Sequence, residues 1–207
     1  MKEIAAIVVL CCAGMGGVLA ADAAFSGRVA VELVEDIAHD HRLRLLEDFS
    51  FRDGDGRLWV ARKGGIVDGM PAQAVDSSWV QLPYAGKLRK ASVVHDYFVS
   101  LKTEPWREVH RMYFAANLAE GVSTPEAKIL HMLVYAGDWR WEPRGSSCYR
   151  SCHSAATMLA WRPVTEIEAL RPLVDWIWAS SPSLDEIEQR TDALIRKPGP
   201  HIFSQGY

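Results

Sequence analysis

The sequence predicts an α+β protein in which a small antiparallel β-sheet or hairpin packs on a three-helix core, with additional C-terminal helices. Short stretches of alternating apolar and polar residues occupy the first third of the chain, as in strands. Helical periodicity with capping signals dominates after residue 86. Hydrophobic residues make up 49% of the 207 residues, which is enough to bury a core.

The first 23 residues are predicted to be a signal peptide. Lys2 precedes an apolar run over residues 4–19, and small residues around Ala21 and Ala23 fit a cleavage site. An uncleaved membrane anchor is the alternative, but the run is shorter than the about 20 apolar residues that span a bilayer. We therefore expect a periplasmic or secreted protein.

Residues 24–141 are predicted to form the main α+β domain. Alternation over residues 28–35 and again over residues 43–51 predicts strands. The sequence Asp53-Gly-Asp-Gly56 supplies turn residues before residues 58–60 resume the strand pattern, which predicts a hairpin. Asp53 and Asp55 also resemble the start of a calcium loop, but the ligands expected downstream are absent.

Three helices are predicted to follow, over residues 86–101, 103–121 and 123–136. Thr103 is the expected cap of the second helix, and Ser123 and Glu126 form a capping box for the third. In the first helix the expected buried stripe is Ala91, Val94, Phe98 and Leu101.

Residues 142–207 are predicted to form a helical C-terminal extension. Short helices are expected over residues 154–161 and 170–178, and Ser183 should cap a charged, solvated lid helix over residues 184–196. Cleavage of the signal peptide would leave Cys148 and Cys152 as a pair that suits one disulfide in an oxidising compartment. The alternative is that both cysteines bind a metal with His153.

The candidate site is a His-Asp pair on the first helix and a histidine on the second. His95 and Asp96 are the candidate catalytic residues, with His95 as base or ligand. His95, His110 and Asp68 are the candidate metal ligands, because two imidazoles and a carboxylate suit zinc, manganese or iron. The cofactor is therefore unknown, with a divalent metal ion as the candidate. The alternative is that both histidines form hydrogen bonds within a helix pair.

Two known classes of enzyme use adjacent histidine and aspartate. In His-Asp metal phosphohydrolases both residues bind metal, and His39, His131 and Asp138 are the further ligands that this chain could offer. In secreted phospholipases A2 the histidine activates water and the aspartate binds calcium, but the second helix here offers His110 in place of an acid. Both comparisons are analogies of mechanism.

Several motifs occur together in the order of one known family. They are Val67-Asp68-Gly69, Trp79, Pro83-Tyr-Ala-Gly86-Lys-Leu-Arg89-Lys-Ala91, Val94-His95-Asp96-Tyr97, Trp106-x-x-Val109-His110-Arg-Met112, Gly121-Val122, Ala127-Lys128 and Gly137-Asp-Trp139. On these motifs, residues 64–141 resemble the family catalogued as domain of unknown function 1353, which is widespread in bacteriophage genomes and in bacteria. The resemblance implies a fold and the position of a site, with no substrate.

This chain departs from the family pattern in one loop. The family shows Asp-Gly-Ala-Ser-Ile-Pro, whereas this chain reads Asp68-Gly69-Met70-Pro71-Ala72-Gln73. The altered loop favours an exported, non-catalytic, envelope-associated or phage-derived binding protein. The alternative is a metal-dependent hydrolase that acts on a cell-envelope substrate. A cell-envelope component is the candidate partner, and the net charge of −3 without a basic run argues against nucleic acid.

Overall fold

The computed structural model describes residues 23–34, 42–67, 90–143, 158–163 and 165–196. The elements are, in chain order, β1 (Ala24–Ser26), β2 (Val31–Leu33), β3 (Leu43–Leu45), β4 (Phe49–Arg52), β5 (Leu58–Ala61), β6 (Ile66–Val67), α1 (Lys90–Leu101), α2 (Trp106–Ala119), α3 (Thr124–Gly137), β7 (Arg140–Pro143), β8 (Met158–Trp161), a 3₁₀ turn (Ile167–Leu170), α4 (Arg171–Ser180) and α5 (Leu184–Asp192). The predicted α+β class is confirmed.

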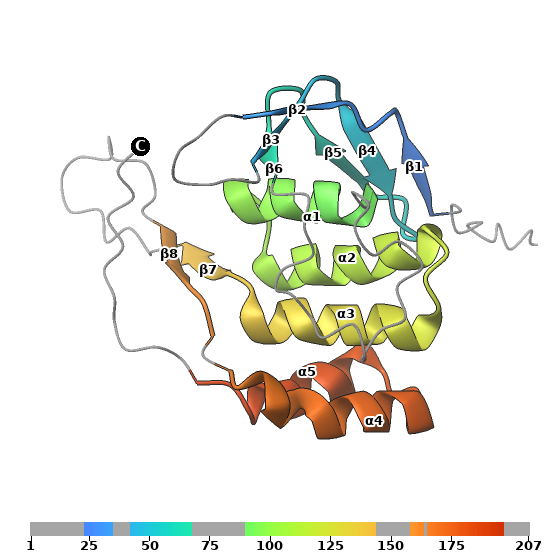
Figure 1. The fold of residues 1–207 in the computed structure, drawn as a ribbon, viewed down its shortest axis with the longest axis vertical. Coiled ribbons are helices and arrows are strands. Elements are labelled where there is room, and N and C mark those ends of the chain that lie inside the picture. Colours follow the sequence, from blue (N-terminus) through green and yellow to red (C-terminus); the bar gives the residue numbers. More distant parts are fainter. Residues whose placement is uncertain (1–22, 35–41, 68–89, 144–157, 164, 197–207) are drawn as a thin grey trace, which may run out of the picture.

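The elements lie in successive layers (Figure 1). Strands β1 to β6 cover one side of α1, and α2, α3 and the α4–α5 pair follow on its other side. All strand pairs are antiparallel, in the orders β1-β4-β5, β2-β3-β6 and β7-β8. No helix in the described part of the chain is both long and apolar enough to cross a bilayer.

The predicted hairpin is β4–β5, and Asp53 closes its turn. One carboxylate oxygen of Asp53 accepts hydrogen bonds from the backbone N–H groups of Asp55 and Arg57, at 3.1 and 2.9 Å. The other oxygen accepts a 2.9 Å hydrogen bond from the indole of Trp59. The carboxylate thus makes the local bonds of an Asx turn, which favours the hairpin interpretation over a calcium loop.

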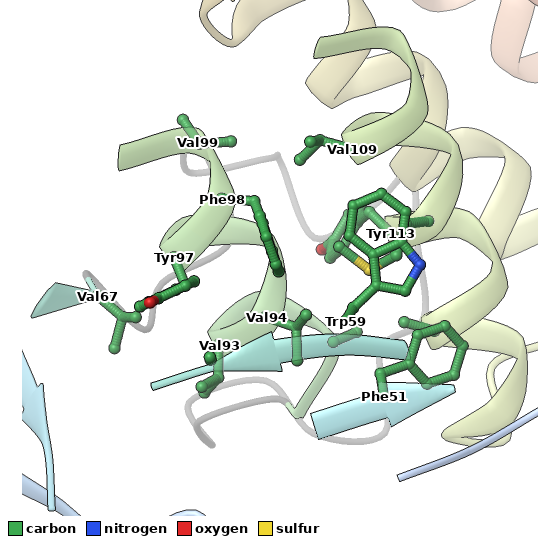
Figure 2. Close-up of a cluster of buried hydrophobic side chains, with 14 of the residues drawn as sticks. Phe51, Trp59, Val67, Val93, Val94, Tyr97, Phe98, Val99, Val109 and Tyr113 are labelled. Atoms are coloured by element: carbon green, nitrogen blue, oxygen red, sulfur yellow. The ribbon is translucent and has the colours of Figure 1, made fainter. Parts of the chain in front are cut away.

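Helix α1 is buried on more of its circumference than the sequence pattern predicted. It lies between the strands and α2, so both of these layers cover it. Figure 2 shows side chains from α1 meeting those of β4, β5 and α2 in one apolar cluster. The predicted stripe is too narrow, because Val93 and Val99 are also buried, and its last member, Leu101, is 51% exposed.

We expect Gly65→Ala to destabilise the contact between α1 and the strands. A methyl group at Gly65 would lie 2.5 Å from two ring carbons of Tyr97, so the ring or the β5–β6 connection must move. We expect a loss of about 1–3 kcal/mol in the free energy of unfolding, measured by urea denaturation. Gly54→Ala is the control, because nothing lies within 4 Å of its added methyl group. Equal stability of the two variants would contradict this packing.

The predicted helix starts are partly right. The N-cap of α2 is Pro105 and not Thr103, since the helix begins two residues later than the pattern suggested. Ser123 is the N-cap of α3, and its hydroxyl donates to Glu126 at 2.6 Å instead of accepting from the backbone. Ser183 and Glu186 form the complete capping box predicted for α5.

The C-terminal region departs from the sequence prediction at two points. Residues 158–161 form strand β8 and not the end of a helix, because they pair with β7. Helix α5 ends at Asp192 and is not a solvated lid, since Ile187, Glu188 and Thr191 are buried. A second apolar core joins α3 to α4 and α5, and its members are Ile129, Met132, Ala136, Leu170, Leu173, Val174, Ile177 and Ile187.

Candidate functional site

Two imidazole rings meet where α1 packs on α2. Nε2 of His95 lies 2.9 Å from Nδ1 of His110, which is a hydrogen-bond distance. Both rings are sealed from solvent, with 2% and 0% of their surface exposed. The two histidines that the sequence placed in a shared pocket are therefore in direct contact, deep in the helical layer.

Two carboxylates lie beside His95. Oδ1 of Asp96 is 3.6 Å from Nδ1 of His95, and Oδ2 of Asp138 is 3.9 Å from Nε2. Asp138 follows the last residue of α3 and also accepts a 2.7 Å hydrogen bond from the backbone N–H of Trp139. The end of α3 therefore contributes an acid to the histidine pair that the predicted ligand set did not include.

The predicted metal site is not assembled from the described residues. Asp68, its third ligand, lies outside them. Among the residues that the structure does describe, no three histidine, cysteine or acidic side chains are arranged to hold a metal ion. Cys148 and Cys152, the predicted disulfide, and residues 1–22 of the predicted signal peptide also lie outside the described part of the chain.

His110 is held in its neutral form. Burial lowers the pKa of His110 well below its usual range, and the nearby His95, His131 and Arg140 lower it further. The backbone carbonyl of Trp139 favours the protonated ring but offsets these effects only in part. Nε2 of His110 is buried and forms no hydrogen bond of standard geometry within the described structure, although the carbonyl of Trp139 is near enough to act on the ring. An unsatisfied buried nitrogen of this kind requires an explanation.

Two proton arrangements satisfy the bond between the neutral His110 and His95. In the first, Nδ1–H of His110 donates to His95, whose own Nδ1–H then points at Asp96, and Nε2 of His110 keeps a free lone pair. In the second, Nε2–H of His95 donates to Nδ1 of His110, and the proton of His110 lies on Nε2, where the backbone carbonyl of Trp139 is the acceptor. Only the first arrangement gives the site a base or metal ligand.

A third buried histidine connects this pair to α5. Nδ1 of His131 lies 3.1 Å from the backbone carbonyl of His110, and Nε2 lies 3.2 Å from a carboxylate oxygen of Glu188. Both partners are oxygen acceptors, so the ring joins the backbone of α2 to the carboxylate of Glu188 on α5. His131 makes these contacts with 0% of its surface exposed.

Two arginines of α2 complete the surroundings of Glu188. Arg111 donates to its two carboxylate oxygens at 2.7 and 3.0 Å, and Arg107 lies 3.3 Å away. Burial raises the pKa of Glu188, but the bonds from His131 and Arg111 outweigh it and hold the pKa at about 2. The network fixes α5 against α2 and α3 by charge as well as by apolar contact.

A second polar contact fixes the C-terminal end of α5. The hydroxyl of Tyr135 donates to Asp192 at 2.9 Å and accepts from Arg107 at 3.0 Å. Arg140 lies 3.3 Å from Asp192 and stacks on the ring of Tyr135. Sequence reasoning missed both contacts of α5, because their partners are more than 50 positions apart and no local pattern joins them.

The comparisons with known proteins agree with the resemblance in the sequence. Residues 43–134 match the model of the family described as protein of unknown function (DUF1353). The match begins before residue 64 and ends before residue 141, which are the bounds of the segment that carries the motifs. No solved structure matches the chain.

Two curated relatives come from Sinorhizobium fredii. The uncharacterized protein y4iH is 33% identical over 107 residues, which are 51% of this chain and 45% of that protein. The uncharacterized protein y4jT is 35% identical over 102 residues, which are 48% of this chain and 30% of that protein. The aligned part of the chain therefore spans less than half the length of either relative.

Proposed function

We propose that this chain, whose residues 43–134 match the DUF1353 family model, has a non-catalytic binding function at the cell envelope. In this proposal His95 and His110 hold the fold together and do not process a substrate. The observation that carries it is the burial of both rings, which are 2% and 0% exposed and bonded to each other. A catalytic group must reach its substrate, and a sealed pair does not offer such access.

The export signal and the altered loop support this proposal from the sequence. The apolar N-terminal run favours a periplasmic or secreted protein. The loop at Asp68 lacks the serine of the family pattern, which favours a chain that binds without catalysis. The proposed partner is a component of the cell envelope. Cell fractionation combined with mass determination of the mature N-terminus tests the proposed location.

A double-mutant cycle on the histidine pair tests the structural role. His95→Leu and His110→Leu should each destabilise the fold by about 2 kcal/mol, because each leaves a buried nitrogen without its partner. The double variant removes both nitrogens and should be more stable than the sum of the single losses, by a coupling energy of about 1 kcal/mol. Urea denaturation of all four proteins measures the cycle. Single variants as stable as the native chain would contradict the proposal.

A metal-dependent hydrolase is the second candidate, and the unsatisfied nitrogen of His110 favours it. If Nε2 carries a lone pair, it is a ligand or base oriented through His95 by the carboxylate of Asp96. A lone pair on Nε2 would suit a metal ion, whereas a proton on Nε2 would suit the carbonyl of Trp139, so the position of this proton separates the two candidates.

Metal analysis and nitrogen NMR test the second candidate. Elemental analysis of the purified mature protein should find zinc, manganese or iron at a stoichiometric level, or titration should load it. The ¹⁵N shift of His110 should place the proton on Nδ1 and leave Nε2 unprotonated. No bound metal, no uptake on titration and a proton on Nε2 would together exclude this candidate.

A further inference from the structure

Lys102 adopts a backbone conformation that favours glycine. It directly follows α1, its N–H donates to the carbonyl of Phe98 at 2.8 Å, and its φ is +56°. Helices commonly end on glycine in this left-handed conformation, because a side chain there costs about 1 kcal/mol or more. A lysine at this position therefore stores strain, and strained backbone gathers at functional sites.

The ammonium group of Lys102 is also poorly compensated. It is half-buried, and this burial lowers the pKa of Lys102. The nearby carboxylate of Asp138 raises the pKa again, but only in part. Its nearest hydrogen bond is a long one, 3.5 Å to the carbonyl of Ser100, and no carboxylate of the described residues pairs with it within 4.0 Å. Nζ lies 5.6 Å from the centre of the Trp139 ring.

A second cation lies at the same indole ring. The guanidinium of Arg162, which follows β8, is 5.1 Å from the centre of the Trp139 ring. Its acidic neighbour is Asp138, at a loose 3.9 Å, and more than half of the Arg162 side chain is exposed. Two cations from distant parts of the chain therefore face one indole ring and share a single buried carboxylate.

We propose that Lys102, Arg162 and Trp139 form a binding site for the anionic group of a ligand, either a phosphate or a carboxylate. Lys102 and Arg162 carry two positive charges against the single negative charge of Asp138, and a bound anion would neutralise the remaining positive charge. Both cations lie over the indole ring, 5.6 and 5.1 Å from its centre, so an anion that bridges them is paired with two positive charges. Both phosphate and carboxylate are recognised by paired lysine and arginine side chains. The site shares Asp138 with the histidine pair but does not use His95 or His110, so it does not rest on the proposed role of that pair.

Calorimetric titration of the full chain tests this site. Inorganic phosphate and acetate are titrated separately at constant ionic strength, with chloride as the reference anion. One of the two should bind at a single site with millimolar affinity, and its identity distinguishes the two chemical sources. Lys102→Gly and Arg162→Gln should each weaken that binding at least fivefold. Arg44→Gln, which removes an exposed arginine paired with Glu32, is the control and should bind as the native chain does.

The Lys102→Gly variant also separates binding from folding. Glycine relieves the left-handed strain, so the melting temperature should rise by about 2–4 °C while anion binding falls. Lys102→Asn, which also tolerates this conformation, should lose binding without loss of the fold. Absence of saturable binding would overturn the proposal. Equal affinity in the native chain, Lys102→Gly and Arg162→Gln would show an adventitious ion only, and this result would also overturn the proposal.

Discussion

Glu188→Ala should lower the free energy of unfolding by about 3 kcal/mol. The substitution leaves the ring of His131 buried without its carboxylate partner, and it removes the shared partner of Arg107 and Arg111. The two arginines are partly exposed and regain water, so the greatest cost falls on His131. Urea denaturation followed by circular dichroism measures the loss.

Asp185→Ala is the matched control for this prediction. Asp185 also pairs with Arg111 from α5, but its side chain is 82% exposed. An exposed pair of this kind contributes about 0.2–1 kcal/mol, so the variant should be close to the native chain in stability. If Asp185→Ala costs as much as Glu188→Ala, the buried charge at Glu188 is not what fixes α5.

The polar contacts that anchor α5 could not be predicted from the sequence, although the start of the helix could. The capping box of Ser183 and Glu186 predicted the start of this helix, because capping is a relation between residues three positions apart. Its buried face was not predicted, because most of the helix is charged and charged helices usually face solvent. Glu188 can be buried because hydrogen-bonding side chains that lie 57 to 81 positions earlier in the chain, Arg107, Arg111 and His131, surround it.

The same distinction between local and distant relations holds for the histidine pair. Helical spacing predicted that His95 and His110 border the faces of two neighbouring helices, and the rings are in contact. Asp138 was considered only as a further ligand by analogy with the phosphohydrolases, and no local pattern placed it beside His95, because it enters from the end of α3. Nor did the helical spacing predict the complete burial of His110, which depends on the layers packed around α2.

The prediction for residues 158–161 failed for a related reason. The run Met158-Leu-Ala-Trp161 has no periodicity that separates a short helix from a short strand, and both interpretations fit four apolar residues. Backbone pairing with β7 decides between them. A strand of this length has too few residues to specify its own conformation, so its partner determines it.

Protonation of His110 should make the fold less stable in mild acid. The pKa of His110 in the folded chain is well below its usual value of 6.5, mainly through burial. Below pH 6.5 the unfolded chain therefore binds a proton that the folded chain does not. The free energy of unfolding should fall by about 1.4 kcal/mol for each pH unit below 6.5, until the folded ring also titrates.

His110→Asn isolates this effect, because the asparagine amide can occupy the position of Nδ1 beside His95 but does not titrate. The stability advantage of the native chain over this variant should shrink as the pH falls from 6.5, as measured by urea denaturation at several pH values. Met112→Ala, a buried and non-titrating change on the same helix, should cost the same at every pH. A pH-independent difference between the native chain and His110→Asn would mean that the buried ring accepts a proton as readily as an exposed one.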